Sequence, residues 1–113
     1  MNMKVGEKME IYDKAAWQID GGVPADLVVS HFNTVFKWLN DHEMLSDEGI
    51  EEFEDGIDEE ASLNENLVTE EGASFLHAHY DDYLRAIAED KYGSDENGEE
   101  LEKIYQQYKN ESN

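Results

Sequence analysis

The sequence predicts an all-α fold, a compact bundle of four to five helices with two long central helices. Residues 24–45 and residues 70–91 each repeat apolar side chains at helical spacing. No segment alternates apolar and polar residues at a period of two over several residues. Because the chain has 113 residues, 39% of them hydrophobic, and no long linker, we expect one domain over 1–113, with frayed ends at 1–8 and 110–113.

The first long helix, in residues 24–45, is the most apolar segment of the chain. Its apolar positions recur at i, i+4, i+7 and i+11: Val28, Phe32, Val35 and Leu39. Pro24 suits the first helical turn, where a missing N–H costs nothing. We expect this helix to end between His42 and Leu45, and shorter helices to cover it.

The segment before it predicts a short helix over residues 9–19. One helical face would carry Met9, Tyr12, Ala16 and Ile19. An extended conformation of Glu10–Tyr12 remains an open alternative. The run Asp20-Gly21-Gly22 is typical of a turn and leads into the first long helix.

An acidic helix is predicted over about residues 47–60. Ser46 suits its N-cap, and Asp47 and Glu48 would lie at its positive end. Its apolar positions are few, namely Ile50, Phe53 and Ile57. Residues 61–68 would then form a connector in which Leu63 and Leu67 reach the core.

The second long helix, residues 70–91, should be capped by Thr69 and broken at Gly93-Ser94. Its apolar positions again follow helical spacing: Leu76, Tyr80, Tyr83 and Ile87. A last helix is expected over about 96–109, with Leu101, Ile104, Tyr105 and Tyr108 on one face.

Charge is the feature that bears most on function. The chain has 29 acidic residues against 8 basic ones, a formal net charge of −21. No Lys or Arg occurs among the 47 residues from Trp38 to Leu84, which contain 16 Asp and Glu. Such a chain repels nucleic acid and anionic membranes, so basic protein surfaces are its natural partners.

These observations predict an acidic interaction protein that binds and inhibits a basic protein partner, such as a nuclease or another nucleic-acid-binding protein. Carboxylates spaced along a helix would stand where phosphates otherwise bind. The expected partner-binding residues are Glu51, Glu52, Glu54, Asp55, Asp58 and Glu59, with Asp81 and Asp82 adjoining them. Two alternatives stay open: a merely solubilising acidic surface, and a structural or regulatory module that self-associates through an apolar patch around Trp38. Either a monomer or a homodimer is compatible with the sequence.

Enzyme and metal chemistry find little support in the sequence. There is no Cys, no Gly-rich phosphate loop and no recognisable nucleophile motif, so we expect no catalytic residue and no cofactor. His77 and His79 lie about 200° apart on a helix and cannot share a metal, so no metal site is expected. His31 and Trp38 both lie off the main apolar stripe, and a second packed helix explains Trp38 better than an exposed surface does. With no apolar run long enough to span a bilayer and no signal-peptide pattern, a cytoplasmic location is expected.

Five short segments carry a family resemblance: residues 12–17 (YDKAAW), 19–22 (IDGG), 44–49 (MLSDEG), 56–58 (GID) and 62–64 (SLN). They resemble a family of small acidic bacterial proteins with an uncharacterised domain. That family is similar in size and charge to the immunity proteins that neutralise bacterial toxins. The resemblance implies a bacterial, cytoplasmic and non-enzymatic protein, and it transfers no functional residue.

Overall fold

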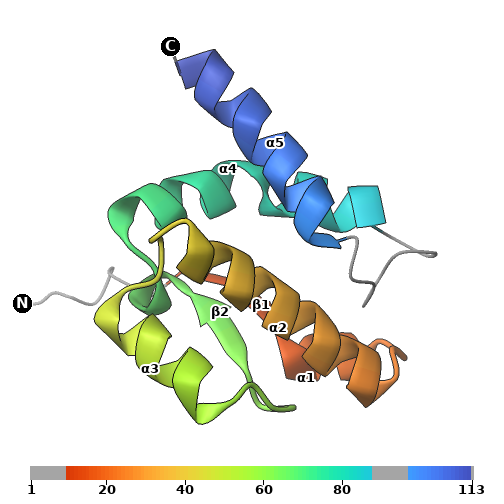
Figure 1. The fold of residues 1–113 in the computed structure, drawn as a ribbon. Coiled ribbons are helices and arrows are strands. Elements are labelled where there is room, and N and C mark those ends of the chain that lie inside the picture. Colours follow the sequence, from red (N-terminus) through yellow and green to blue (C-terminus); the bar gives the residue numbers. More distant parts are fainter. Residues whose placement is uncertain (1–9, 88–96, 113) are drawn as a thin grey trace, which may run out of the picture.

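The computed structural model describes residues 10–87 and 97–112, and Figure 1 shows their arrangement. The elements, in chain order, are β1 (Ile11–Lys14), α1 (Ala15–Asp20), α2 (Ala25–Asp41), α3 (Asp47–Asp55), β2 (Ser62–Asn64), the 3₁₀ turn η2 (Glu65–Leu67), α4 (Glu70–Ile87) and α5 (Asn97–Ser112). The fold is therefore mainly helical, as predicted, with one small antiparallel sheet that the prediction of an all-α fold lacked.

The sheet replaces the first half of the predicted helix over residues 9–19. Ile11 lies opposite Asn64 and Lys14 lies opposite Ser62, with an irregularity between Ile11 and Asp13. The extended alternative was therefore the right one for Ile11 and Tyr12, and helix α1 begins only at Ala15. The connector predicted for residues 61–68 supplies the partner strand. Local periodicity did not reveal this pairing because its two strands are short and about 50 residues apart in the chain.

Helix α2 confirms the prediction of a central apolar helix. Its four predicted core residues are all buried: Val28, Phe32, Val35 and Leu39. Pro24 caps the helix instead of forming its first turn. The helix ends at Asp41, slightly earlier than predicted, and Glu43 with φ of 59° turns the chain so that Met44 enters the core.

Helix α3 begins where the sequence predicts it. The Ser46 hydroxyl accepts a hydrogen bond of 3.1 Å from the backbone N–H of Gly49. The predicted end near residue 60 is wrong, since the helix stops at Asp55 and Gly56 takes φ of 106°, a conformation that favours glycine. Leu63 and Leu67 beyond it are buried, as expected.

Helix α4 confirms the second long helix. The Thr69 hydroxyl accepts a hydrogen bond of 3.2 Å from the N–H of Gly72, which is the predicted cap. The predicted continuation over 88–91 and the break at Gly93-Ser94 lie outside the described residues, as do residues 1–9. Helix α5 runs to Ser112 and so includes residues 110–112, which the sequence analysis expects to be frayed.

The helices enclose one core. Figure 1 shows α5 and α3 on either side of α2, and α5 packs against both α2 and α4. The two long central helices meet through large side chains, for example Trp38 of α2 and Phe75 of α4, whose ring centroids lie 5.5 Å apart. Helix α5, with 16 residues, is nearly as long as α2 and α4 and closes this interface. Among the helices that the structure describes, none is long and apolar enough to cross a membrane.

Candidate functional site

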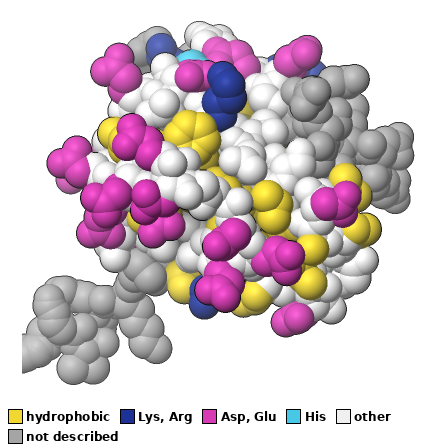
Figure 2. Space-filling model, turned by 60° about the horizontal axis from the view of Figure 1, so that its bottom comes forward, with side chains coloured by type: hydrophobic (Ala, Val, Ile, Leu, Met, Phe, Trp, Pro, Cys, Tyr) yellow, Lys and Arg dark blue, Asp and Glu magenta, His cyan; other side chains and the backbone are white. Residues whose placement is uncertain are grey.

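Six of the predicted binding residues form one exposed acidic surface, which we call the α3 surface. Four belong to α3 and two to the turn that follows it: Glu51, Glu52, Glu54, Asp55, Asp58 and Glu59. Ile50, Phe53 and Ile57 pack against the core on the opposite side and so hold these carboxylates toward solvent. Figure 2 shows Asp and Glu outnumbering Lys and Arg over the whole face in view, with a dense group in the region of α3.

The position of α3 is fixed by close backbone contacts as well as by its cap. A Cβ atom at Gly49 would lie only 2.0 Å from the carbonyl oxygen of Leu67, so the helix backbone rests directly on η2. The Ser46 hydroxyl also donates a hydrogen bond of 2.7 Å to the carbonyl oxygen of Asn66. The α3 surface therefore stands on a firmly anchored helix.

No Lys or Arg of the described residues neutralises the α3 surface. Lys37 pairs with Asp41, Lys103 pairs with Glu100 and Arg85 pairs with Asp82, each pair lying within a single helix. The two remaining described cations lie over aromatic rings, Lys14 over Trp17 and Lys109 over Tyr105. Among the residues that the structure describes, the negative charge of the α3 surface is therefore not offset by any Lys or Arg.

Part of the negative charge of α3 lies at the end of the helix where the helix dipole disfavours it. Glu52, Glu54 and Asp55 occupy the last turn, where the helix carries partial negative charge and where α3 has no basic residue. Each such carboxylate lowers the free energy of unfolding by about 0.3–1 kcal/mol at low ionic strength. Stability alone would favour Lys or Arg at these positions.

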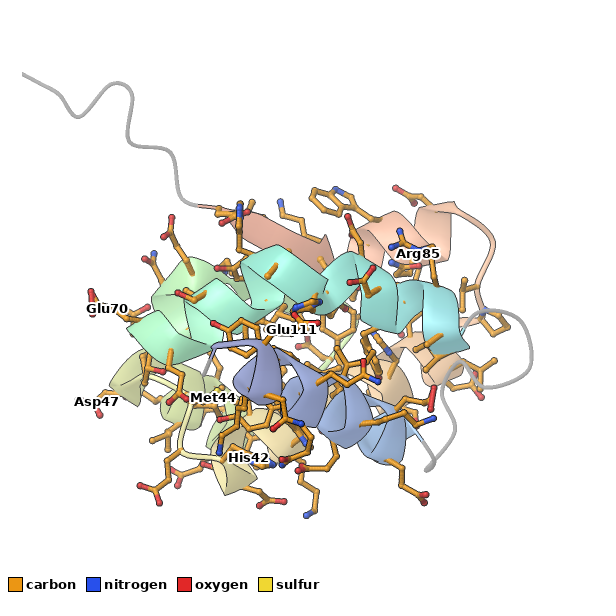
Figure 3. The ribbon with its side chains drawn as sticks, turned by 90° about the horizontal axis from the view of Figure 1, so that it is seen from above. His42, Met44, Asp47, Glu70, Arg85 and Glu111 are labelled. Atoms are coloured by element: carbon orange, nitrogen blue, oxygen red, sulfur yellow. The ribbon has the colours of Figure 1, made fainter. Side chains whose placement is uncertain are left out.

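Asp81 and Asp82 stand apart from the α3 surface. In Figure 3, Arg85 marks one end of α4, whereas Glu70, at the other end, lies toward Asp47 of α3. Asp82 pairs with Arg85 and with His79 Nδ1 at 2.9 Å. The hydrogen bond from His79 is the main cause that holds the pKa of Asp82 below its ordinary value.

Asp81 lies against a different part of the molecule. It lines a hollow of about 160 Å³ beside β1, together with Glu10, Tyr12 and His77. Burial and the charges of Glu10 and Glu65 raise the pKa of Tyr12 to about 12. The structure therefore does not join Asp81 and Asp82 to the other six predicted residues.

Two carboxylates that were not among the predicted binding residues adjoin the α3 surface. Glu48 and Glu60 line a hollow of about 300 Å³ between α3 and β2, together with Glu52. Both belong to the acidic run that the sequence displays. Their approach to Glu52 depends on how the chain folds back after Gly56, which no local pattern predicts.

A buried polar cluster lies where three other elements, β1, α2 and α4, meet. The Tyr80 hydroxyl donates a hydrogen bond of 2.6 Å to Asp13 Oδ2, and His31 Nε2 lies 2.9 Å from the same hydroxyl. Asp13 Oδ1 accepts hydrogen bonds of 2.9 Å from the Lys14 N–H and from the Gln18 side chain. Because Asp13, His31 and Tyr80 are at most 3% exposed, this cluster connects β1, α2 and α4 and presents almost no surface to solvent.

Trp38 belongs to the contact between α2 and α5, as the preferred interpretation of the sequence had it. It is 7% exposed, and its indole N–H donates a hydrogen bond of 3.0 Å to Glu102 Oε1. His42 Nε2 lies 2.7 Å from the same oxygen. Trp38 therefore does not form the exposed apolar patch that the self-association alternative places around it.

The described residues contain no group of three or more His, Asp or Glu side chains placed to hold a metal ion. Comparison with known proteins adds no assignment: no family model matches the chain, and neither a curated protein nor a solved structure matches it. A function can therefore be proposed only from the charge and geometry of the described residues.

Proposed function

We propose that this protein is a non-enzymatic, acidic interaction protein of the bacterial cytoplasm that binds and inhibits a basic protein. The proposed partner is a nuclease or another nucleic-acid-binding protein, and the mode of action is that of an immunity protein or a nucleic-acid mimic. The observation that carries the proposal is the α3 surface, six exposed carboxylates on an anchored element with no neutralising Lys or Arg among the described residues.

The density of charge on α3 supports mimicry of nucleic acid. Glu51, Glu52, Glu54 and Asp55 lie within five residues of helix. Four steps along an α-helix advance about 6 Å, so the surface presents about one charge per 1.5–2 Å of axis. Duplex DNA carries about one charge per 1.7 Å. Glu51, Glu54 and Asp55 also fall within an arc of about 100° around the helix and can meet one basic surface together.

Charge of this kind acts mainly on the rate of association. A field of one sign draws a basic protein toward the α3 surface and orients it, and this steering raises the association rate by about 10- to 1,000-fold at low salt. Once bound, the carboxylates occupy the Lys and Arg side chains with which the partner would contact phosphates. Inhibition then requires no chemical step.

The experiment compares two variants that carry the same net charge. In the test variant Glu51→Lys, Glu54→Lys, Asp55→Lys and Glu59→Lys reverse the α3 surface. In the control variant Asp20→Lys, Asp26→Lys, Asp81→Lys and Glu111→Lys reverse exposed carboxylates elsewhere. Each protein is used to capture partners from bacterial lysate at low salt, and association rates with the captured protein are measured over a range of ionic strength.

We expect the wild-type protein and the control variant to retain one basic protein at low salt. The test variant should lose it or associate about ten or more times more slowly, with a flatter dependence on salt. Equal losses in both variants would mean that only total charge matters, and the proposal of a specific α3 surface would then fail. Circular dichroism of both variants checks that each remains folded.

A further inference from the structure

A groove between α2 and α5 differs in character from the α3 surface. Thr34, Trp38 and Asp41 line it from α2, and Gly98, Glu99 and Glu102 line it from α5. Its volume is about 390 Å³. This is within the range of about 300–1,000 Å³ that is usual for ligand sites and leaves ample room for one long side chain.

The floor of the groove is apolar and held in place. The indole of Trp38 packs against Phe75 and Tyr105, with ring centroids 5.5 and 5.2 Å away, while its N–H is bound by Glu102. Gly98 has no side chain to fill the space beside it. A Cβ atom there would come no closer than 3.9 Å to the Thr34 methyl group. The groove thus has a rigid apolar base.

The rim of the groove is acidic. Asp41, Glu99 and Glu102 contribute three carboxylates, and Lys37, the remaining lining residue, contributes one ammonium group, so the lining carries a net charge of −2 (three negative charges and one positive). Lys37 Nζ lies 3.0 Å from Asp41 Oδ2, but its side chain is 70% exposed. Because an exposed ion pair of this kind contributes little, Lys37 can move aside for a competing cation.

Glu102 is the fixed anion of this rim. Its Oε2 accepts a hydrogen bond of 2.6 Å from Gln106, and its Oε1 lies within 3.0 Å of Trp38 Nε1 and His42 Nε2. The hydrogen bond from Gln106, helped by those from Trp38 and His42, holds the pKa of Glu102 below its ordinary value, although partial burial opposes this effect. The carboxylate is therefore charged and oriented before any ligand arrives.

We infer that this groove receives an arginine side chain of the basic partner. The methylene groups of arginine would lie on Trp38, Thr34 and the backbone of Gly98. Its guanidinium group would reach Glu99 and take the place of Lys37 beside Asp41. The inference rests on the proposed function only in taking the partner to be basic, since the groove is built from α2 and α5 and contains no residue of the α3 surface.

Arginine suits the groove better than lysine does. A guanidinium group is planar, offers five N–H donors and is more weakly hydrated than an ammonium group, so it can leave water for a partly apolar site. It also interacts favourably with aromatic rings. A lysine ammonium would keep more of its hydration and gain less from the apolar floor.

The test is an NMR titration of the ¹⁵N-labelled protein with N-acetyl-arginine methylamide. The chain has two Trp residues, and Trp17, which is 52% exposed, provides an internal control for Trp38. A Trp17→Phe variant assigns the two indole N–H signals. The neutral analogue N-acetyl-citrulline methylamide and the lysine analogue serve as ligand controls.

We expect saturable shifts of the Trp38 indole and of the Gly98 and Glu99 amides with the arginine compound, and none with citrulline. Gly98→Leu should fill the groove and weaken binding by about tenfold or more. Glu99→Gln, which leaves the packing intact, should weaken binding by about threefold. This second variant tests the inference even if Gly98→Leu disturbs α5.

Three results would overturn the inference. The first is shifts of equal size with citrulline, and the second is unchanged binding in Gly98→Leu and Glu99→Gln. The third is a groove signal that moves when the protein alone is diluted, which would assign the groove to a second copy of the chain. The four-residue α3 variant separates the two proposals, because it should still bind the arginine compound even if it has lost the protein partner.

Discussion

Tyr80 and Asp13, 67 residues apart in the chain, are joined by a buried hydrogen bond of 2.6 Å between the phenol and a carboxylate oxygen. The contact ties the middle of α4 to strand β1. His31 of α2 approaches the same hydroxyl at 2.9 Å, so three elements meet at one polar point inside the core. A buried carboxylate is costly unless it is hydrogen-bonded, and here Asp13 accepts a bond on each of its oxygens.

Tyr80→Phe should therefore destabilise the protein strongly. The change removes one donor from buried Asp13, and the expected loss is about 1–3 kcal/mol of unfolding free energy. Urea denaturation followed by circular dichroism measures it. Tyr12→Phe is the matched control, because the Tyr12 hydroxyl is half-buried and makes a longer bond of 3.4 Å to the Ala73 carbonyl. Losses of the same size in both variants would contradict a special role for the Asp13–Tyr80 bond.

Reversal of negative charge in the last turn of α3 should instead make the protein more stable. Glu54→Lys with Asp55→Lys should stabilise the protein by about 0.5–1 kcal/mol at low salt, because positive charge then faces the negative end of the helix. The same pair should weaken partner binding if the α3 surface has the proposed role. Thermal unfolding at two salt concentrations checks the first effect, which should shrink at high salt.

Asp47→Lys is the control for that experiment. Asp47 lies in the first turn of the same helix, where a negative charge is favourable, so its reversal should lower stability although the change in net charge has the same sign. If every reversal stabilised the protein equally, relief of overall repulsion in a chain of net charge −21 would be the cause, and position along the helix would not matter.

The long helices were predictable from sequence because their information is local. The spacing of Val28, Phe32 and Val35 sets one apolar face, and Ser46 and Thr69 mark helix starts through bonds that span three residues. The exposure of the α3 carboxylates followed for the same reason. Once the apolar positions of that helix turn inward, the acidic positions must turn outward.

The sheet, the buried cluster and the groove depend on contacts between residues that are far apart in the chain. Local sequence patterns do not predict such contacts. Nothing in the local sequence indicates that Asp13 is buried, and its burial depends on hydrogen bonds that include the one from distant Tyr80. The separation of Asp82 from α3 follows from the direction of α4. Thr34 and Gly98 come together across 64 residues because α5 folds back onto α2.

Glu102 gives a prediction about pH. Its pKa in the folded protein lies below the ordinary value of 4.5. Its contribution to stability is therefore fully present above pH 4.5 and is lost as the pH falls further, through the lowered pKa. Glu102→Gln should accordingly lower stability at pH 7. The loss should be below about 1 kcal/mol because the side chain is 41% exposed and solvent screens the charge.

The measurement compares urea unfolding of Glu102→Gln and the wild-type protein between pH 7 and pH 3. The difference between the two should narrow as the pH falls below 4.5, since the wild-type side chain then also becomes neutral. Taking the difference removes the general repulsion of the acidic chain, which changes with pH in both proteins. A gap that stayed constant down to pH 3 would contradict the lowered pKa.

Gly49 and Gly98 show how differently two helical glycines are used. At Gly49 a Cβ atom would lie 2.0 Å from the Leu67 carbonyl oxygen, which is backbone and cannot rotate away. Gly49→Ala should therefore push α3 off η2 and cost about 1–3 kcal/mol, despite the higher helix propensity of alanine. At Gly98 the nearest atom is the Thr34 methyl carbon, 3.9 Å away, so Gly98→Ala should be neutral or stabilise α5 by up to about 1 kcal/mol.

Urea denaturation of both variants tests the contrast between Gly49 and Gly98. A neutral Gly49→Ala would contradict a close contact between α3 and η2. Because the α3 surface depends on that contact, Gly49→Ala should also weaken partner binding.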